Sequence, residues 1–248
     1  MLYKYAETVL SLTRSFDCSH VLVSFDNKGS SFRKDILPEY KAHRGKNLSE
    51  EQQAERTYFY EQVAKVPALL TDKDIPAVAL EKVETDDVIA WICKHLHDKV
   101  DEIIIVSSDK DLYQLLIWDN VRIYSLIKQS WTTNESFVAT YGITPELWVD
   151  TKAMMGDSSD NIPGIRLIGE KRALGYIKEF GPTYEDILEK LPKAQKKLGK
   201  IAQALIDGKE IVERNRKLMD LLTHVEEIIP EEYKEALLFY MQEEGIDV

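Results

Sequence analysis

Apolar positions change period several times along the first 155 residues. Residues 3–16 place apolar side chains at helical spacing, and residues 20–25 then form a continuous apolar run that ends in a polar turn at 26–29. A continuous apolar strand between helices is typical of a parallel sheet covered on both faces. The pattern therefore predicts an α/β core.

The same reading extends to the rest of the chain. It predicts further strands at 75–80, 102–107, 121–124 and 130–133, and helices at 50–70 behind the cap Ser49, at 84–97, just after 109, and from Asn134 and Thr144. From Gly156 onward the pattern is helical, apart from a strand predicted at 226–229. Strand–helix alternation followed by helices indicates a sheet domain with a helical part after it.

Length and composition exclude several classes of protein. The chain has 248 residues and no apolar run near the ~20 that a membrane span needs. Residues 1–16 are amphipathic, unlike a signal peptide. Cys18 and Cys93 give neither a disulfide framework nor zinc-site spacing. We therefore expect a protein of a reducing cytoplasm, with no membrane partner.

The charge is unevenly distributed. The net charge is −11, but residues 26–46 carry six Lys/Arg against three acids and residues 164–200 carry nine against five. The tail 231–248 has six acids and one lysine, either as a helix on the core or as a contact arm. Two basic segments beside acidic clusters suit a metal-dependent enzyme that acts on nucleic acid, although ordinary solvated surface charge explains most residues singly.

Eight carboxylates from four separate stretches are placed to meet at one edge of the predicted sheet. They follow strands or flank helices, and they are Asp26; Glu84, Asp86 and Asp87; Asp109 and Asp111; and Asp157 and Asp160. Sites in parallel α/β sheets form outside the carboxyl ends of the strands. Carboxylates this close repel one another, and two Mg²⁺ or Mn²⁺ ions would remove that cost. Singly, each acid has a plainer role as a turn residue, a helix cap or helix N-terminal charge.

Residues 156–172 follow the last of these acids. Asp157 and Asp160 lead into an Asn-Ile-Pro-Gly turn, and a helical pattern starts after Gly169. The segment from Gly164 to Arg172 looks like a helix–hairpin–helix, in which glycines let backbone amides approach a phosphate. The plainer alternative is an acidic surface loop before an ordinary helix cap.

Together these stretches resemble the 5′ nuclease family: the flap endonucleases, the 5′–3′ exonuclease domain of bacterial DNA polymerase I and their free-standing phage relatives. The resembling segments occur in family order and extend to about residue 222; they are residues 23–29, 32–33, 37–44 (Leu-Pro-Glu-Tyr-Lys-Ala-His-Arg), 83–87, 107–112 and 156–172. The resemblance implies a PIN-like (resolvase-like), mostly parallel sheet with helices on both faces, a helical arch, and a C-terminal helical part containing a helix–three-turn–helix.

The resemblance also implies residue roles. Glu84, Asp86 and Asp109, with Asp26 beside them, match ligands of a catalytic metal; Asp111, Asp157 and Asp160 match a second metal position; and Asp87 matches a supporting acid. Lys41 and Arg44 match arch-base residues that neutralise the scissile phosphate. Tyr40 would stack on a terminal base and Arg33 would hold the phosphate backbone. Gly164, Gly169, Lys171 and Arg172 match a duplex anchor, often with a K⁺ ion.

The expected organisation is a metal-binding core at 1–155 with an arch at about 33–73, a DNA-binding region at 156–222 and an acidic extension at 223–248. The implied function is a Mg²⁺-dependent 5′–3′ exonuclease or flap endonuclease acting on 5′ flaps, free 5′ ends or junctions of DNA, and also on RNA–DNA hybrids. We expect a monomer in a bacterial or phage-infected cell.

One family feature does not match. Members begin with an apolar strand ending in Asp-Gly ahead of the helix that matches 3–16, whereas this sequence starts inside that helix. We expect unpaired strand edges as a result. A start site further upstream is the favoured explanation; a strand from another chain is a second. The third is that cleavage does not carry over, which would leave a junction-binding protein. A ribonuclease of the wider PIN-like group is the remaining alternative, against which the arch motif and the hairpin weigh.

Overall fold

The computed structural model describes residues 2–27, 30–46 and 48–246, so part of the predicted turn at 26–29 lies outside the described residues. Its helices up to residue 155 are α1 (Leu2–Ser15), α2 (Ser31–Ile36), α3 (Glu50–Val63), α4 (Val66–Thr71), α5 (Thr85–Leu96), α6 (Asn134–Tyr141) and α7 (Trp148–Met155), with 3₁₀ turns η1 (Asp111–Ile117) and η2 (Pro145–Leu147). Its strands there are β1 (Val23–Ser24), β2 (Ala77–Val78), β3 (Ile103–Val106), β4 (Val121–Ser125) and β5 (Ser130–Thr132).

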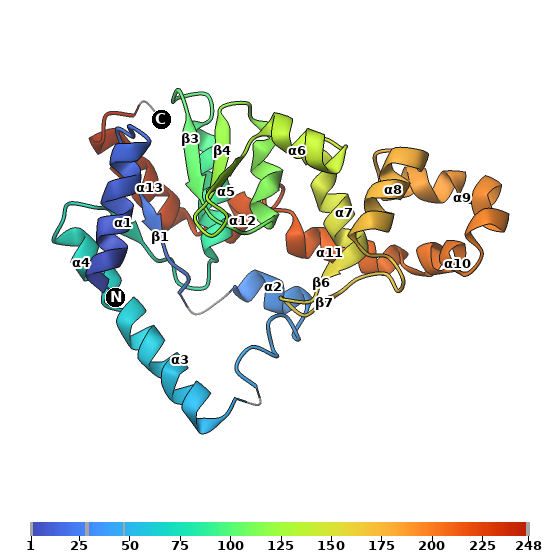
Figure 1. Ribbon diagram of the computed structural model, residues 1–248, viewed down its shortest axis with the longest axis horizontal. Helices are drawn as coiled ribbons and strands as arrows, with labels where there is room; N and C mark the ends of the chain where they lie inside the picture. The colour runs from blue at the N-terminus through green and yellow to red at the C-terminus, as the bar shows by residue number, and fades with distance from the viewer. Residues whose placement is uncertain (1, 28–29, 47, 247–248) are drawn as a thin grey trace.

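Local sequence signals account for these elements. Ser49 caps α3, as the sequence predicts, and the structure adds a capping box with Gln52; the acids of the first turn suit the helix N-terminus. Pro145 opens the turn before α7. The segment between α2 and α3 runs to a helix that stands away from the sheet, at the lower left of Figure 1.

The sheet is mostly parallel, as predicted, but it is in two pieces. β1 pairs with β2, and β3 pairs with β4, both in parallel; β5 then adds an antiparallel edge to β4. Within the described residues no strand is hydrogen-bonded to both pieces. At the ends of β3 and β1, Val106 is 41% exposed, and the Ser24 hydroxyl is buried without a hydrogen-bond partner among the described residues. Unpaired backbone groups at the strand edges stay a prediction.

One large core joins the sheet region to the helical part. The indole rings of Trp91 and Trp148, the Phe137 ring and the Tyr184 ring are all nearly inaccessible to solvent and belong to the same apolar cluster. Burial of each such side chain contributes on the order of 2–3 kcal/mol. Because α7 packs against both sheet-side and C-terminal elements, the loop that follows it is held between the two parts.

The remaining elements form the right-hand part of Figure 1 and the return of the chain. They are β6 (Gly156–Asp157), β7 (Ile162–Pro163), α8 (Glu170–Phe180), α9 (Tyr184–Leu198), α10 (Lys200–Asp207), α11 (Lys209–Met219), α12 (Val225–Ile228) and α13 (Glu231–Glu243). The sequence pattern missed the short antiparallel pair β6–β7, because two residues per strand carry no periodicity.

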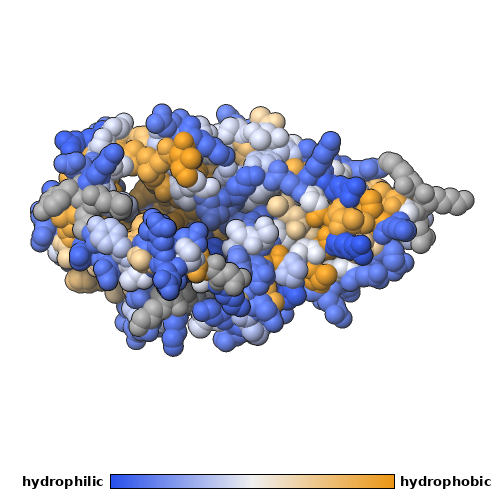
Figure 2. Space-filling model, turned by 60° about the horizontal axis from the view of Figure 1, so that its bottom comes forward, coloured by the Kyte–Doolittle hydropathy of each residue, from blue (hydrophilic) through white to orange (hydrophobic). Residues whose placement is uncertain are grey.

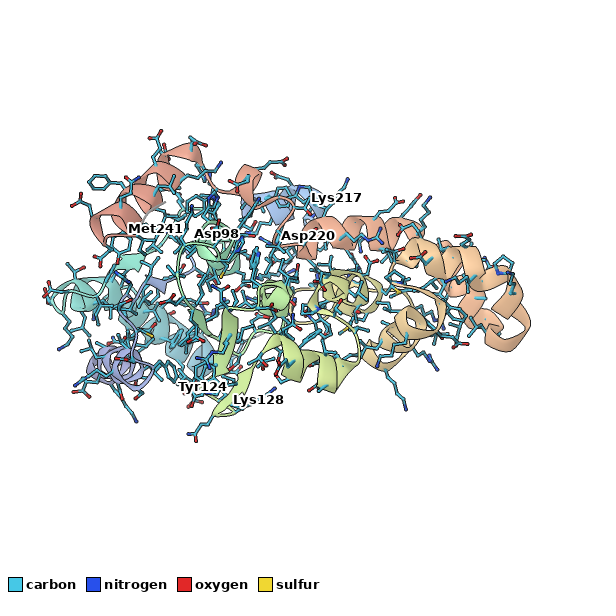
Figure 3. The ribbon with its side chains drawn as sticks, turned by 90° about the horizontal axis from the view of Figure 1, so that it is seen from above. Asp98, Tyr124, Lys128, Lys217, Asp220 and Met241 are labelled. Atoms are coloured by element: carbon cyan, nitrogen blue, oxygen red, sulfur yellow. The ribbon has the colours of Figure 1, made fainter. Side chains whose placement is uncertain are left out.

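The strand predicted at 226–229 is wrong: these residues lie in α12 and at its end. Glu226 decides this, because its carboxylate accepts hydrogen bonds from the Trp91 indole (3.1 Å) and bonds His95 Nε2 (3.0 Å), both on α5. The acidic tail is a helix on the core, since Leu237 and Met241 of α13 are buried. Figure 3 shows Met241 on α13 and Asp220 where α11 ends. No helix among the described residues is both long and apolar enough to cross a membrane.

Candidate functional site

The first group of acids gathers where β1 and β3 end and α5 begins. Asp26 lies two residues beyond β1, and its Oδ1 accepts a hydrogen bond from the Thr85 backbone N–H, the first of α5 (2.8 Å). Glu84 is the residue before α5, and Asp109 follows β3. The carboxyl ends of the parallel strands thus bring these acids to one edge, as the sequence predicts.

Asp86 is crowded by other acids. Burial, followed by repulsion from Asp109, Asp111, Asp26 and Glu84, raises the pKa of Asp86 to about 8. In the part of the chain that the structure describes, no Lys, Arg or His forms an ion pair with Asp26, Asp86 or Asp109 (all ion pairs found lie elsewhere). A divalent cation bound here would relieve this repulsion, and carboxylate oxygens are the ligands that Mg²⁺ prefers.

The second group consists of Asp111, Asp157 and Asp160. Each of these three acids is ion-paired with a protein cation, whereas in the first group only Glu84 is paired among the described residues. Lys152 Nζ lies 2.6 Å from Asp111 Oδ1 and 2.5 Å from Asp157 Oδ2. Although burial opposes the effect, hydrogen bonds from Lys152 and Ser159 hold the pKa of Asp157 below its usual range. Burial outweighs the attraction of Lys152 at Asp111 and raises its pKa to about 6.

The predicted arch base binds directly to these carboxylates. Lys41 Nζ is 2.6 Å from Glu84 Oε1, and Arg44 Nη2 is 2.5 Å from Asp160 Oδ1. The backbone is tied as well: the Lys41 N–H donates to the Asp160 carbonyl (2.8 Å), and the Asn161 amide donates to the Glu39 carbonyl (2.7 Å). The segments 39–44 and 160–161, some 120 residues apart in sequence, are therefore held together beside the site by side-chain and backbone contacts.

Tyr40 lies between these two segments and the carboxylates. Its side chain is 3% exposed, and its hydroxyl donates to Glu84 Oε2 (2.8 Å) and lies 3.1 Å from Asp160 Oδ2. The prediction that Tyr40 stacks on a terminal base does not fit this placement, because its ring is buried and its hydroxyl links the two carboxylate groups.

Arg33 and Asp87 also differ from their predicted roles. Arg33 is 4% exposed and Asp87 is fully buried; the guanidinium donates two hydrogen bonds to the Asp87 carboxylate, at 2.6 and 2.8 Å. A third goes to the Leu218 carbonyl (2.9 Å), and Glu84 Oε2 lies 3.3 Å from Nη1. Arg33 is therefore placed to fix α2 and Glu84 rather than to hold a phosphate. Asp87 supports Arg33: both of its carboxylate oxygens accept hydrogen bonds from the guanidinium, so Asp87 is not placed as a metal ligand.

The glycine-containing segment lies beside the second group. A Cβ on Gly164 would come within 2.2 Å of the Met155 backbone, so only glycine lets β7 pack against the end of α7. Gly169 caps α8 without a side-chain hydrogen bond, and a Cβ there would meet nothing within 4 Å. Lys171 and Arg172 are exposed on the first turn of α8. Their contact with a duplex stays a prediction.

The donor set fits hard divalent ions, although the carboxylates are not assembled into a ready cage. Among the described residues no three acidic, His or Cys side chains are close enough together to hold a metal ion as they stand. The space between Tyr40, Glu84, Asp86, Asp111 and Asp160 is only about 10 Å³, that of one water-sized sphere. Asp111 Oδ1 is buried and, in the described part of the chain, accepts no well-directed hydrogen bond; Lys152 meets it only as an ion pair.

Sequence reasoning missed two contributors to the site. Lys152 stands five residues before Asp157 and directly before the apolar run 153–155 of a helix; a charge beside such a run is often buried with a partner, and this was the available signal. Asn161 was taken only as part of a turn. Its φ of +59° is a left-handed conformation that asparagine tolerates well, and this lets its amide reach Glu39.

Comparison with known proteins decides the family. Residues 1–142 match the profile of the 5'-3' exonuclease N-terminal resolvase-like domain, and residues 143–237 match the 5'-3' exonuclease C-terminal SAM fold. The chain belongs to the 5'-3' exonuclease family. This confirms the predicted family and fold class.

Individual relatives agree. The 5'-3' exonuclease of Halalkalibacterium halodurans is 34% identical over 89% of this chain and 71% of its own length. That of Buchnera aphidicola (Schizaphis graminum) is 33% identical over 78% of this chain, which spans 64% of that relative's length. A structure of bacteriophage T5 flap endonuclease, in a pseudo-enzyme–product complex with DNA and metal ions, has a TM-score of 0.85 at 30% identity and covers 98% of this chain and 89% of its own.

Proposed function

We propose that the protein is a divalent-metal-dependent 5′ nuclease that hydrolyses DNA phosphodiesters at free 5′ ends and flaps. The observation that carries the proposal is the meeting of two carboxylate groups with the arch-base cations at one edge of the sheet, in a family member. Mg²⁺ fits the oxygen donor set, and Mn²⁺ would substitute. Bound metal would lower the pKa of a water to give a nucleophile and would stabilise the leaving oxygen.

The protein's own residues prepare the substrate phosphate. Asp26, Glu84, Asp86 and Asp109 would hold one ion, and Asp111, Asp157 and Asp160 a second. Lys41 and Arg44 are ion-paired with Glu84 and Asp160. An incoming phosphodiester offers these cations a new anionic partner. Their positive charge would then lie beside the oxygens on which negative charge develops during hydrolysis.

The exposed cations at the start of α8 support a duplex anchor. Helix N-termini bind phosphate through their unbonded N–H groups. Lys171 and Arg172 add positive charge beside the N-cap Gly169, which makes no side-chain cap hydrogen bond. We propose that this anchor takes the duplex side of a flap, with a K⁺ ion on the carbonyls of 164–169, and that the protein acts as a monomer. An RNA strand paired with DNA would present the same phosphates and is a further substrate.

A cleavage assay on a 5′-flap DNA with Mg²⁺ tests the proposal. Asp109→Asn should reduce the single-turnover rate by about a hundredfold or more while leaving flap binding intact, because it removes a metal ligand and not a DNA contact. Asp98→Asn makes the same chemical change on the exposed surface and should cleave like the wild type. Unchanged cleavage by Asp109→Asn would contradict the site. Tight flap binding without any wild-type cleavage would favour the junction-binding alternative.

The role of Lys41 is tested separately. Lys41→Ala should lower the single-turnover rate more than it weakens flap binding, because its charge is needed as the phosphate reacts. Lys128→Ala, on the exposed turn between β4 and β5, is the matched control; Figure 3 shows Lys128 at the far edge from Asp220. A rate equal to that of the control would refute the role.

A further inference from the structure

Lys152 is a buried cation placed between two carboxylates of the proposed second metal position. Its side chain is 6% exposed, and its ammonium nitrogen is 2.6 Å from an Asp111 oxygen and 2.5 Å from an Asp157 oxygen. Lysine is almost never buried this deeply unless it is paired. The two aspartates are more accessible than the lysine, so the ion pair faces the site from its protein side.

The two carboxylate groups are therefore electrically unequal. In the first group Glu84 is paired with Lys41 and Arg33. Its other members, Asp26, Asp86 and Asp109, have no ion-paired cation among the described residues, and they repel one another strongly. In the second group Lys152 forms ion pairs with both Asp111 and Asp157. A divalent ion entering the first group meets three carboxylates, Asp26, Asp86 and Asp109, that have no ion-paired cation among the described residues. An ion entering the second must first compete with a positive charge that already lies on its ligands.

We propose that Lys152 is a positioning residue that holds Asp111 and Asp157 together without metal and competes with the second divalent ion for them. This inference rests on the proposed function, since it concerns the metal position of that same site. In the metal-free protein Lys152 stabilises two half-buried acids that would otherwise repel each other. When the second ion binds, Lys152 keeps one carboxylate oxygen oriented and makes that ion's affinity weak.

The anchoring of Lys152 supports this division of roles. It lies on α7, which is fixed by Trp148 and Met154, both fully buried, so the ammonium cannot move far from the site. Asp157, the last residue of β6, uses its two oxygens differently: Oδ1 accepts from the Ser159 N–H and hydroxyl, at 2.8 and 2.6 Å, and Oδ2 meets Lys152. The carboxylate therefore keeps its Ser159 donors when an entering ion competes with Lys152 for Oδ2.

The test is Mn²⁺ binding without DNA, measured by titration calorimetry and by the electron paramagnetic resonance signal of unbound Mn²⁺. Lys152→Met keeps length and apolar bulk but removes the charge. A neighbouring opposite charge lowers a carboxylate's affinity for a proton by about one to three powers of ten, and Lys152 opposes a bound cation in the same way. The second Mn²⁺ should therefore bind at least about tenfold more tightly to this variant, and the first should bind unchanged. The metal-free variant should melt earlier, and saturating Mn²⁺ should restore more stability than in the wild type.

Two further variants separate this role from simple stabilisation. Lys234→Met removes another partly buried lysine, 15% exposed and paired with Glu226 and Glu231 on the opposite part of the fold. It should lower stability without altering either Mn²⁺ affinity. Lys152→Arg keeps the charge and should keep the second affinity weak, and it remains measurable if Lys152→Met does not fold without metal.

The outcomes are distinct. A second Mn²⁺ affinity in Lys152→Met equal to or weaker than that of the wild type overturns the inference, as does a Lys152→Arg variant that binds the second ion tightly. Wild-type protein that binds Mn²⁺ but does not cleave flaps contradicts the proposed function and leaves the inference about Lys152 standing. Wild-type protein that binds no Mn²⁺ contradicts both.

Discussion

Replacing Arg33 with methionine should destabilise the fold far more than it affects any DNA contact. The side chain is buried, and it donates two hydrogen bonds to the fully buried Asp87 and one to the Leu218 carbonyl. Removing one partner of a buried ion pair leaves the other charge unpaired, which costs about 3–5 kcal/mol. At roughly 2–4 °C per kcal/mol for a chain of this size, the melting temperature should fall by about 6–20 °C.

The assay is thermal and urea unfolding of the metal-free protein, beside flap-DNA binding at a temperature where each variant is folded. Arg122→Met is the matched control, because Arg122 pairs with Glu102 on the surface and its loss should cost under about 1 kcal/mol. The double variant Arg33→Met/Asp87→Leu should recover most of the lost stability, since it leaves no buried charge alone. An Arg33→Met variant as stable as Arg122→Met, but weak in DNA binding, would refute the structural role and restore the phosphate contact.

Two other predictions follow from the same contacts. Burial raises the pKa of Glu226, but hydrogen bonds from His95, Lys94 and Trp91 outweigh burial and lower this pKa to about 2 from its ordinary 4.5. The ionised Glu226 therefore stabilises the fold fully above about pH 4.5, and this stabilisation is lost as the pH falls toward 2. The difference in melting temperature between wild type and Glu226→Gln should close over that range, and a difference independent of pH would contradict this. Gly164→Ala should lower stability by about 1–3 kcal/mol, because the new Cβ meets the Met155 backbone, whereas Gly169→Ala should change unfolding little; equal effects would contradict the close approach.

Most of the fold followed from signals within a few residues of each other. Apolar spacing indicated α1 and α5, and Ser49 with the acids that follow it indicated the start of α3. The one strand predicted in the wrong place failed for a physical reason. An isolated run at 226–229 has no period long enough to separate strand from helix, and Glu226 finds its partners on α5, about 130 residues earlier.

The sequence alone determined the family and the gathering of acids at one edge of the sheet, because motif order and the strand ends that carry Asp26 and Asp109 are local facts. Only the tertiary structure decided which charge pairs with which. Arg33 and Asp87 are 54 residues apart, and Tyr40 and Asp160 are 120 apart. The local sequence around an arginine or tyrosine in a basic, polar segment is the same whether its side chain faces solvent or the core. Its burial depends on the segment packed over it, and that packing removed Arg33 and Tyr40 from the predicted DNA surface and placed Lys152 in the site.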